Sequence, residues 1–450
     1  MMAGLTVVAL AAAMIGGWRI SSALPFSLAI GSAIFSGWNA EAGSPLPLSR
    51  VLLAIGVAVM LARAADARDE WRLQWRSIHS LMYAAVAFAV VSAAVAGTLN
   101  QPAANYALLD KFGIVPFVLF AIAPHVFVTR RDRNILLVTL VVVGAYLAVT
   151  AILEGFGALD VVWPGYIADQ ALGIHQERAR GPFLEATTNG LSLFVCAVAA
   201  WIGARTWLRP GAQCVALVVG VACVMATVAT VTRSIWLGTA LGVTVLALGD
   251  GRTRRWLTSA LPVLIGIALA AYVFVPGLAE TSGERASSER PLWDRVNSNR
   301  AALEAWREQP LLGVGWGRFP GAHQNAFLQA DTIPLTGSQI EVHNVFLANL
   351  TELGMLGAGL WVVVLVSAIG LAVARRCPEH LRLWRLGLGA IFLQWLVVAS
   401  FAPLSGAFPN MVLWTFAGIV SAAAVQPRSG VFPARPIVRT RAAVFERGQA

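Results

Sequence analysis

Long apolar runs separated by short polar connections make up most of this 450-residue chain. A helix that crosses the hydrocarbon core of a bilayer needs about 20 apolar residues, and most of the runs approach this length. We therefore predict an all-α, polytopic membrane protein with about 12–13 transmembrane helices. The apolar runs lie at residues 3–17, 22–38, 47–62, 79–97, 111–128, 135–153, 186–204, 213–231, 234–249, 257–276, 343–373, 386–402 and 410–425.

One connection breaks this pattern, because residues 277–342 are polar over a length that no other connection reaches. Loops longer than about 12–15 residues are uncommon in compact proteins and are usually functional. Helical spacing over residues 299–306, followed by Pro310, predicts an amphipathic helix along the outer membrane surface, so that the loop contains short helices. We expect four parts: membrane helices over 1–276 (about ten spans), the large loop at 277–342, about three spans over 343–425, and a disordered basic tail at 426–450.

The arginine distribution indicates how the chain is oriented. Hydrophobic residues make up 58% of the chain and charged residues 12%, against about 45–50% and 25% in soluble proteins. Arginines concentrate in alternate connections, and short loops rich in Lys and Arg face the cytoplasm. In a bacterial inner membrane the large loop is then periplasmic and the C-terminus cytoplasmic, while the side of the N-terminus stays open. Because the net charge of +10 follows this topology, it does not indicate a nucleic-acid partner.

Three further arginines, Arg178, Arg180 and Arg233, fall on the predicted periplasmic side, close to the membrane. Charges in such places are costly and usually functional, and a guanidinium can bind phosphate oxygens in a bidentate manner. Arg178 and Arg180 precede a predicted helix start, where an anion is favoured. The alternatives are solvated loop arginines at 178 and 180 and a snorkelling side chain at Arg233.

His343 stands at the junction between the polar loop and an apolar helix pattern. An imidazole has an unperturbed pKa near neutrality, so it can orient or deprotonate a hydroxyl group. Glu341, two residues earlier, is placed to tune it. The alternative is that His343 only caps the helix.

Metal and nucleotide sites find no support in the pattern. The six histidines are scattered, and no His/Asp/Glu group has the spacing of HExxH. The glycine-rich stretch at 313–317 follows a helical pattern rather than a strand, so we expect a flexible turn instead of a dinucleotide site. We expect no metal and no cofactor.

These segments together resemble the O-antigen ligase and O-antigen polymerase superfamily, bacterial enzymes that act on lipid-linked glycans. The resemblance covers roughly residues 170–420, and the order of its motifs carries it. The motifs are Arg178-Ala179-Arg180-Gly181-Pro182-Phe183 followed by Asn189, Thr232-Arg233-Ser234, Arg300 with Trp306, Pro310, Gly313, Gly315, Gly317 and Phe319, His343-Asn344 with Phe346, Leu347, Glu352, Gly354 and Gly357, and Trp414 before Gly418.

The resemblance implies a GT-C-like helical fold and metal-independent glycan transfer from an undecaprenyl-diphosphate carrier to an acceptor hydroxyl on the periplasmic face. It assigns diphosphate binding to Arg178 or Arg180 and to Arg233, and assigns activation or orientation of the acceptor to His343. Glu185-Ala186-Thr187 departs from the usual family pattern before Asn189, which leaves open which of the first two arginines binds. Supporting candidates on the acceptor side are Arg300, Trp306, Asn344 and Glu352.

The acceptor distinguishes the remaining alternatives. A ligase moves the finished glycan to lipid A core, whereas a polymerase of the same superfamily extends a lipid-linked O-antigen or exopolysaccharide. Attack by one hydroxyl at the anomeric carbon would invert its configuration. The partners are then the lipid-linked glycan donor, the acceptor and membrane lipids. A less favoured alternative is a transporter or flippase of lipid-linked sugar, which would place charges along a pathway within the membrane.

Overall fold

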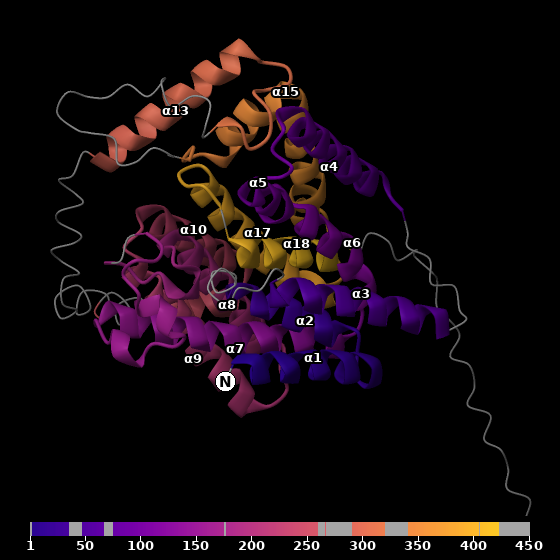
Figure 1. Ribbon diagram of the computed structural model, residues 1–450. Helices are drawn as coiled ribbons and strands as arrows, with labels where there is room; N and C mark the ends of the chain where they lie inside the picture. Colours follow the sequence, from indigo (N-terminus) through magenta and orange to yellow (C-terminus); the bar gives the residue numbers. More distant parts are fainter. Residues whose placement is uncertain are drawn as a thin grey trace, which may run out of the picture.

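The computed structural model describes residues 2–35, 47–66, 75–174, 177–259, 266, 290–319, 341–404 and 406–422. Every regular element in these ranges is a helix (Figure 1). Eight of the helices there are long and apolar enough to cross a membrane, and three shorter apolar helices accompany them. The predicted all-α, polytopic membrane protein is confirmed. Most of the predicted run at 257–276 and the tail after residue 422 lie outside the described residues.

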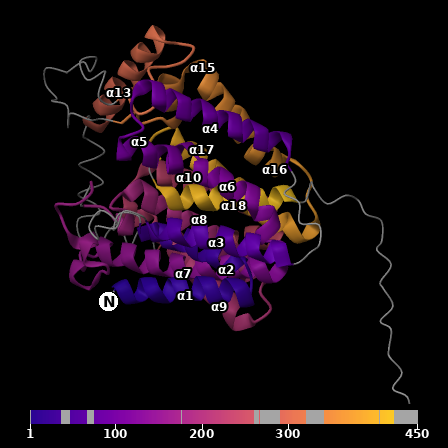
Figure 2. The same ribbon diagram turned by 45° about the vertical axis from the view of Figure 1, so that its right-hand side comes forward.

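The three N-terminal helices pack against one another, and the second of them contacts α7 (Arg130–Gly155), the longest single α-helix among the described residues. They are α1 (Met2–Arg19), α2 (Ala23–Ser32) and α3 (Leu48–Asp66), and Figures 1 and 2 show them side by side with α7. Phe26 and Ile30 of α2 are completely buried. The two predicted runs at the start of the chain therefore form helices that belong to the packed body of the protein.

Two helices are buried around their whole circumference and form the centre of the molecule. They are α8 (Ala186–Thr206) and α18 (Ala407–Ser421). A helix that is hydrophobic on every face belongs in a core. Around them pack α6 (Ile114–Val126), α9 (Pro210–Ala226), α10 (Arg233–Gly249) and α17 (Arg382–Ala399).

Glycines permit close contacts between these helices. A Cβ at Gly190 of α8 would lie 2.6 Å from Ile235 of α10, and one at Gly238 of α10 would lie 2.8 Å from Gln394 of α17. The amide of Gln394 donates to the Thr239 hydroxyl over 3.0 Å, so a buried polar contact joins the same two helices.

A pair of helices rises above this core (Figures 1 and 2). α13 (Arg290–Glu308) packs across the start of α15 (Val345–Leu365). α13 has 19 residues, so it is longer than the short loop helices that the sequence predicts. α15 continues through the π-helix η8 (Val366–Gly370) into α16 (Leu371–Ala374). α4 (Ser77–Ala96) packs beside α15.

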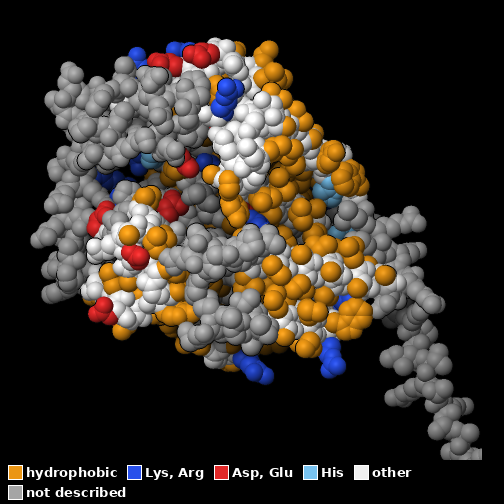
Figure 3. All heavy atoms as spheres, in the orientation of Figure 1, with side chains coloured by type: hydrophobic (Ala, Val, Ile, Leu, Met, Phe, Trp, Pro, Cys, Tyr) orange, Lys and Arg blue, Asp and Glu red, His pale blue; other side chains and the backbone are white. Residues whose placement is uncertain are grey.

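Short elements complete the described chain. α5 (Pro102–Tyr106) and the π-helix η2 (Ala107–Phe112) lead into α6, while the 3-10 turns are η3 (Leu159–Val161), η4 (Gly165–Ala168), η5 (Gly181–Phe183), η6 (Val228–Thr230) and η9 (Glu379–Leu381). Figure 3 shows hydrophobic side chains over much of the face in view, as expected of helices that contact lipid.

Candidate functional site

Residues 178–181 connect the ends of three elements. The Ala179 N–H donates to the Ala229 carbonyl over 3.0 Å, which ties this segment to η6. The N–H groups of Arg180 and Gly181 donate to the two carboxylate oxygens of Glu154, near the end of α7, over 3.1 and 2.8 Å. The segment is therefore fixed at the junction of α7, η6 and the start of α8.

Gly181 allows the close approach of this segment to α8. Its φ is +56°, a left-handed conformation, and an added Cβ would lie 2.7 Å from Oδ1 of Asn189. The buried Asn189 amide also donates to the Ala179 carbonyl over 3.0 Å. The glycine and the asparagine of the first motif thus act together, because one makes room for the other.

The two arginines of this segment have different surroundings. Arg180 is 3% exposed, and its guanidinium donates to the carbonyls of Leu172, Ile167 and Asp169 over 2.5, 3.0 and 3.3 Å. These contacts hold the 167–172 loop in place. Nε of Arg178 lies 3.4 Å from the Glu177 carboxylate, and its side chain keeps 16% exposure.

Arg233 is the first residue of α10 and is exposed. Before it, Val231 has a φ of +43°, which is rare for a β-branched residue and indicates local strain. Hydroxyls of Thr230 and Thr232 donate to carbonyls of the same turn over 2.7 and 2.8 Å. Since Ala229 binds Ala179, this turn brings the start of α10 beside the Arg178 segment.

Arg295 of α13 lies near Arg233, and we refer to Arg178, Arg233 and Arg295 together as the cationic region. Sequence reasoning did not single out Arg295. The pKa of its guanidinium lies below its usual value, because neighbouring atoms desolvate it and because Arg233 repels it. Arg295 lies seven residues before Ala302, which is completely buried against α15. Residues two helical turns apart share one face, so this spacing was the signal that could have identified Arg295.

His343 directly precedes the first turn of α15 and is half-buried. The Asn344 side chain caps this helix, since its Oδ1 accepts from the N–H groups of Phe346 and Leu347 over 2.9 and 3.0 Å. Asn344 therefore fixes where α15 begins, and thereby the backbone on which His343 sits.

The glycine-rich stretch fills a break in α15 and is not the flexible turn that we expected. Gly354 has φ +64° and ψ −173° inside the helix. The N–H groups of Met355 and Leu356 donate to the carbonyls of Pro310 and Leu311 over 2.9 and 3.2 Å. In the other direction, the N–H groups of Val314 and Gly315 donate to the carbonyls of Thr351 and Glu352 over 2.9 and 3.0 Å. The loop thus supplies hydrogen bonds that the helix loses at its break.

Glu352 of α15 forms hydrogen bonds with the same loop. Its carboxylate accepts from the backbone N–H groups of Gly317 and Phe319 and lies in the field of Lys111 and Glu341. Trp316, directly before Gly317, is 2% exposed and donates through its indole N–H to the Ala104 carbonyl over 3.1 Å. The contacts of Glu352 therefore hold the loop against α15.

The last two supporting candidates make local contacts on α13. Arg300 pairs with Glu304, one turn further along, over 3.0 Å, and both side chains are largely exposed. The Trp306 indole N–H donates to the Pro310 carbonyl over 3.2 Å, which helps to end α13 at the glycine-rich loop. Among the residues that the structure describes, no group of three His, Cys, Asp or Glu side chains is placed to hold a metal ion.

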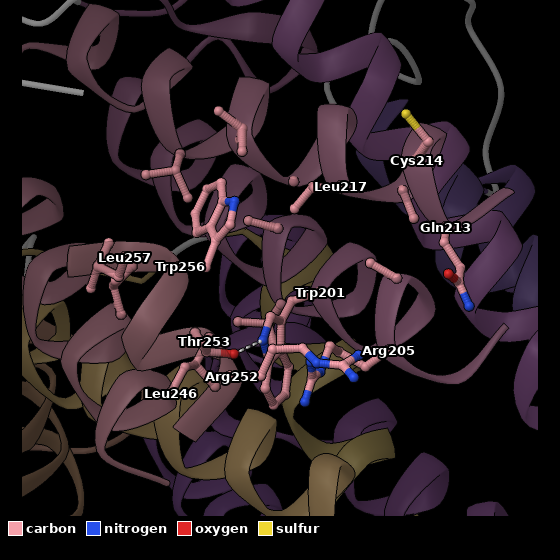
Figure 4. A pocket seen from close by; sticks show the side chains of 18 of the residues that line it. Trp201, Arg205, Gln213, Cys214, Leu217, Leu246, Arg252, Thr253, Trp256 and Leu257 are labelled. Atoms are coloured by element: carbon pink, nitrogen blue, oxygen red, sulfur yellow. Dashed lines mark hydrogen bonds between the residues drawn. The ribbon is translucent and has the colours of Figure 1, made fainter. Parts of the chain in front are cut away.

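A groove of about 460 Å³ runs between α8, α9 and α10 and is closed at one end by residues 252–257 (Figure 4). Its lining is mostly apolar, and the Trp201 indole donates to the Thr253 hydroxyl over 2.8 Å at that end. Arg205, near the C-terminal end of α8, also lines it. Because residues 178–181 adjoin the N-terminal end of α8, this groove lies away from the cationic region.

The fold and the site together define a multi-pass helical membrane protein that gathers arginines from separate segments at one end of its helices. Residues 218–362 match the family model described as O-antigen ligase. No match to a curated protein was found. This match supports the O-antigen ligase and O-antigen polymerase superfamily that the motifs predict, and it supports a function of the ligase or polymerase type. The matched residues include Arg233, Arg295 and His343.

Proposed function

We propose that this protein transfers a glycan from an undecaprenyl-diphosphate carrier to a hydroxyl of lipid A core on the periplasmic face of the inner membrane. The family match supports a lipid-linked glycan as substrate. Under this proposal, residues 277–342 form a periplasmic loop, and α13 within it completes the site above the membrane helices.

The observation that carries the proposal is the gathering of cationic segments around the start of α10. The hydrogen bond from Ala179 to Ala229 brings the segment of Arg178 to this turn, and Arg295 comes close enough to Arg233 to feel its charge. Several positive charges in one place attract an anion. The planar guanidinium matches phosphate oxygens, and the start of a helix also favours an anion.

Arg178, Arg233 and Arg295 then bind the diphosphate, whereas Arg180 holds the neighbouring loop. As the anomeric C–O bond breaks, negative charge develops on the leaving diphosphate, and fixed cations stabilise it. His343 accepts the proton of the attacking hydroxyl, which contributes typically about 10²–10⁴-fold. Attack from the face opposite the leaving group inverts the anomeric configuration.

α13 connects the two halves of this site. Arg295 lies about 10 Å along the helix from Ala302, whose carbonyl accepts from the Thr351 hydroxyl of α15 over 3.0 Å. Val342, beside His343, is buried in the same contact. The diphosphate and the acceptor hydroxyl would therefore meet beneath this helix.

The test uses purified protein with a defined undecaprenyl-diphosphate glycan. One reaction contains lipid A core and a second contains the lipid-linked glycan alone. Glycan on lipid A core supports the ligase. Extension of the carrier-linked glycan in the second reaction identifies a polymerase of the same superfamily. No product in either reaction contradicts the transferase and favours the flippase alternative.

Two variants connect the activity to the site. His343→Ala should abolish transfer at an unchanged protein level. Arg233→Lys should also impair it, because an ammonium group cannot reproduce the bidentate contact. Wild-type transfer by the first variant would remove His343 from the mechanism, and wild-type transfer by the second would favour a snorkelling arginine.

A further inference from the structure

A second arginine cluster lies at the opposite end of the helices, where α4 begins and α16 and α18 end. These helix ends line a pocket of about 350 Å³ together with Phe120 of α6 and residues of the π-helix η8. Arg76, Arg375 and Arg376 all contribute to it. This end carries the arginine-rich connections that we predict to be cytoplasmic.

The charges of this pocket are not balanced by its own residues. Among the described residues that line it, none is Asp or Glu. Glu379, close by in sequence, lies 3.6 Å from Arg382, which is outside the lining. The pKa of Arg76 is below its usual value, because its guanidinium is partly desolvated and because Arg375 repels it. The protein thus holds like charges together, and a bound anion would reduce their repulsion.

The remaining walls are mostly apolar, with Ser77, Ser367 and Ser421 among their residues. Leu81 of α4, Phe120 of α6 and Val420 of α18 line the part of the pocket that faces into the helix bundle. The Ser421 hydroxyl accepts from the Arg76 guanidinium over 3.3 Å and so holds that side chain at the pocket. A cationic rim above an apolar wall is complementary to a phosphate group that carries acyl chains.

We propose that this pocket binds an anionic phospholipid, with the headgroup phosphate at Arg76, Arg375 and Arg376 and an acyl chain along the apolar wall. Basic pockets between transmembrane helices on the cytoplasmic side recognise such headgroups. η8 supplies part of the lining, and π-helical segments are frequent at functional sites. The site is separate from the proposed glycan transfer and does not depend on it.

Cys377 lines the same pocket. The rate at which its thiol is alkylated can therefore be used to measure whether a lipid is bound there. Of the four free cysteines, Cys196 and Cys223 are buried and Cys214 is exposed, so a Cys214→Ala background leaves Cys377 as the reactive thiol. Alkylation by N-ethylmaleimide, a neutral reagent, is followed by mass spectrometry in three preparations. They are phosphatidylcholine vesicles, the same vesicles with phosphatidylglycerol, and phosphatidylcholine vesicles in a buffer with inorganic phosphate. Because burial raises the pKa of the Cys377 thiol, the reaction is run above neutral pH.

Phosphatidylglycerol should slow the alkylation of Cys377 severalfold, and inorganic phosphate should not. Arg376→Gln should raise the phosphatidylglycerol content needed for half-protection about fivefold, and Arg76→Gln with Arg375→Gln should raise it about fivefold for each arginine removed. Arg131→Gln is the matched control, because this exposed arginine lies in another connection of the same predicted side and does not line the pocket.

Three results would overturn the proposal. Equal alkylation in the two lipid mixtures would show that no anionic lipid enters the pocket. Protection by inorganic phosphate alone would identify a site for a free anion. An equal shift in Arg131→Gln and Arg376→Gln would show that only the surface potential matters. Since Arg376 is exposed, its single variant keeps the test valid if the double variant does not fold.

Discussion

Lys111 and Glu341 form an ion pair, with 3.3 Å between Nζ and Oε2, that joins the π-helix η2 to the residue two positions before His343. Lys111 is the only lysine of the chain. Three further contacts hold η2 in place. The Asp110 carboxylate pairs with Arg50, and the Asp110 carbonyl accepts from the Asn410 amide. The Phe112 carbonyl accepts from the Trp361 indole. The pair therefore anchors the chain that leads into His343.

Breaking this pair should lower glycan transfer far more than it lowers stability. The two side chains keep 18% and 52% exposure, and such pairs contribute at most about 1 kcal/mol. A displaced His343 is costly, because a shift of about 1 Å can reduce a rate 100-fold. We expect Lys111→Glu and Glu341→Lys each to reduce kcat about 10- to 100-fold, with little change in the KM of the donor.

The charge-reversed double variant is the control for this prediction. Lys111→Glu combined with Glu341→Lys restores an ion pair, so it should recover much of the activity that each single variant loses. Thermal unfolding of all three proteins should stay close to that of the wild type. Additive losses in the double variant would show that the two charges act separately and would contradict a positioning role.

The helix break at Gly354 should tolerate no side chain. An added Cβ would collide with the Leu311 carbonyl, and the φ of +64° is unfavourable for any other residue. Gly354→Ala should therefore destabilise the protein by about 1–3 kcal/mol and release the glycine-rich loop. Detergent-solubilised protein would show this as a lower Tm and as faster proteolysis between α13 and α15.

Gly359, one turn and a half further along α15, is the matched control. No atom lies within 4 Å of its added Cβ, and its φ is not positive. Alanine is favoured over glycine by about 0.5–1 kcal/mol inside a helix, so Gly359→Ala should keep or raise the Tm. Equal effects of the two substitutions would mean that the loop does not depend on the break.

Substitution of Arg180 should lower the stability of the protein, whereas substitution of Arg178 should weaken donor binding. The sequence alone does not distinguish the two arginines. Arg180→Gln removes the donor of three backbone carbonyls, of which that of Ile167 is buried, and an unsatisfied buried group costs about 1–3 kcal/mol. We expect a lower Tm and less folded protein. Arg178→Gln should keep the Tm and raise the KM for the donor. The reverse assignment, with a stable but inactive Arg180→Gln protein, would make Arg180 the phosphate ligand.

The sequence predicts the membrane fold well because its signal is local. Twenty apolar residues specify a membrane helix wherever the rest of the chain lies, and α7 and α8 appear where their runs predict them. The break at Gly354 was not predicted, because an apolar pattern interrupted by glycine is also compatible with a continuous helix. Its cause, the loop at Pro310 and Leu311, lies more than 40 residues earlier in the chain.

The candidate site was predicted only in part for the same reason. Arg178 and Arg233 could be named because they stand outside the connections that we predict to be cytoplasmic, and His343 because it lies where the polar loop meets an apolar helix pattern. The pairing of Lys111 with Glu341 spans 230 positions, and no local pattern reports such a contact. Arg180 was named as a phosphate-binding candidate, but the sequence could not show that its guanidinium donates to three backbone carbonyls of the protein itself.

Arg295 should bind the donor diphosphate, whereas Arg300, on the same helix, should not. Arg295 senses the charge of Arg233, while Arg300 pairs with Glu304 on the exposed face of α13. A hydrogen bond to a charged group contributes about 1.5–3 kcal/mol, so Arg295→Gln should lower kcat/KM about 10- to 100-fold. Arg300→Gln removes the same charge from the same helix and should change it less than about threefold. Inhibition by inorganic pyrophosphate gives a second readout, since its inhibition constant should rise in Arg295→Gln alone. Equal losses in both variants would mean that α13 contributes only a general positive potential, and the diphosphate site would then consist of Arg178 and Arg233.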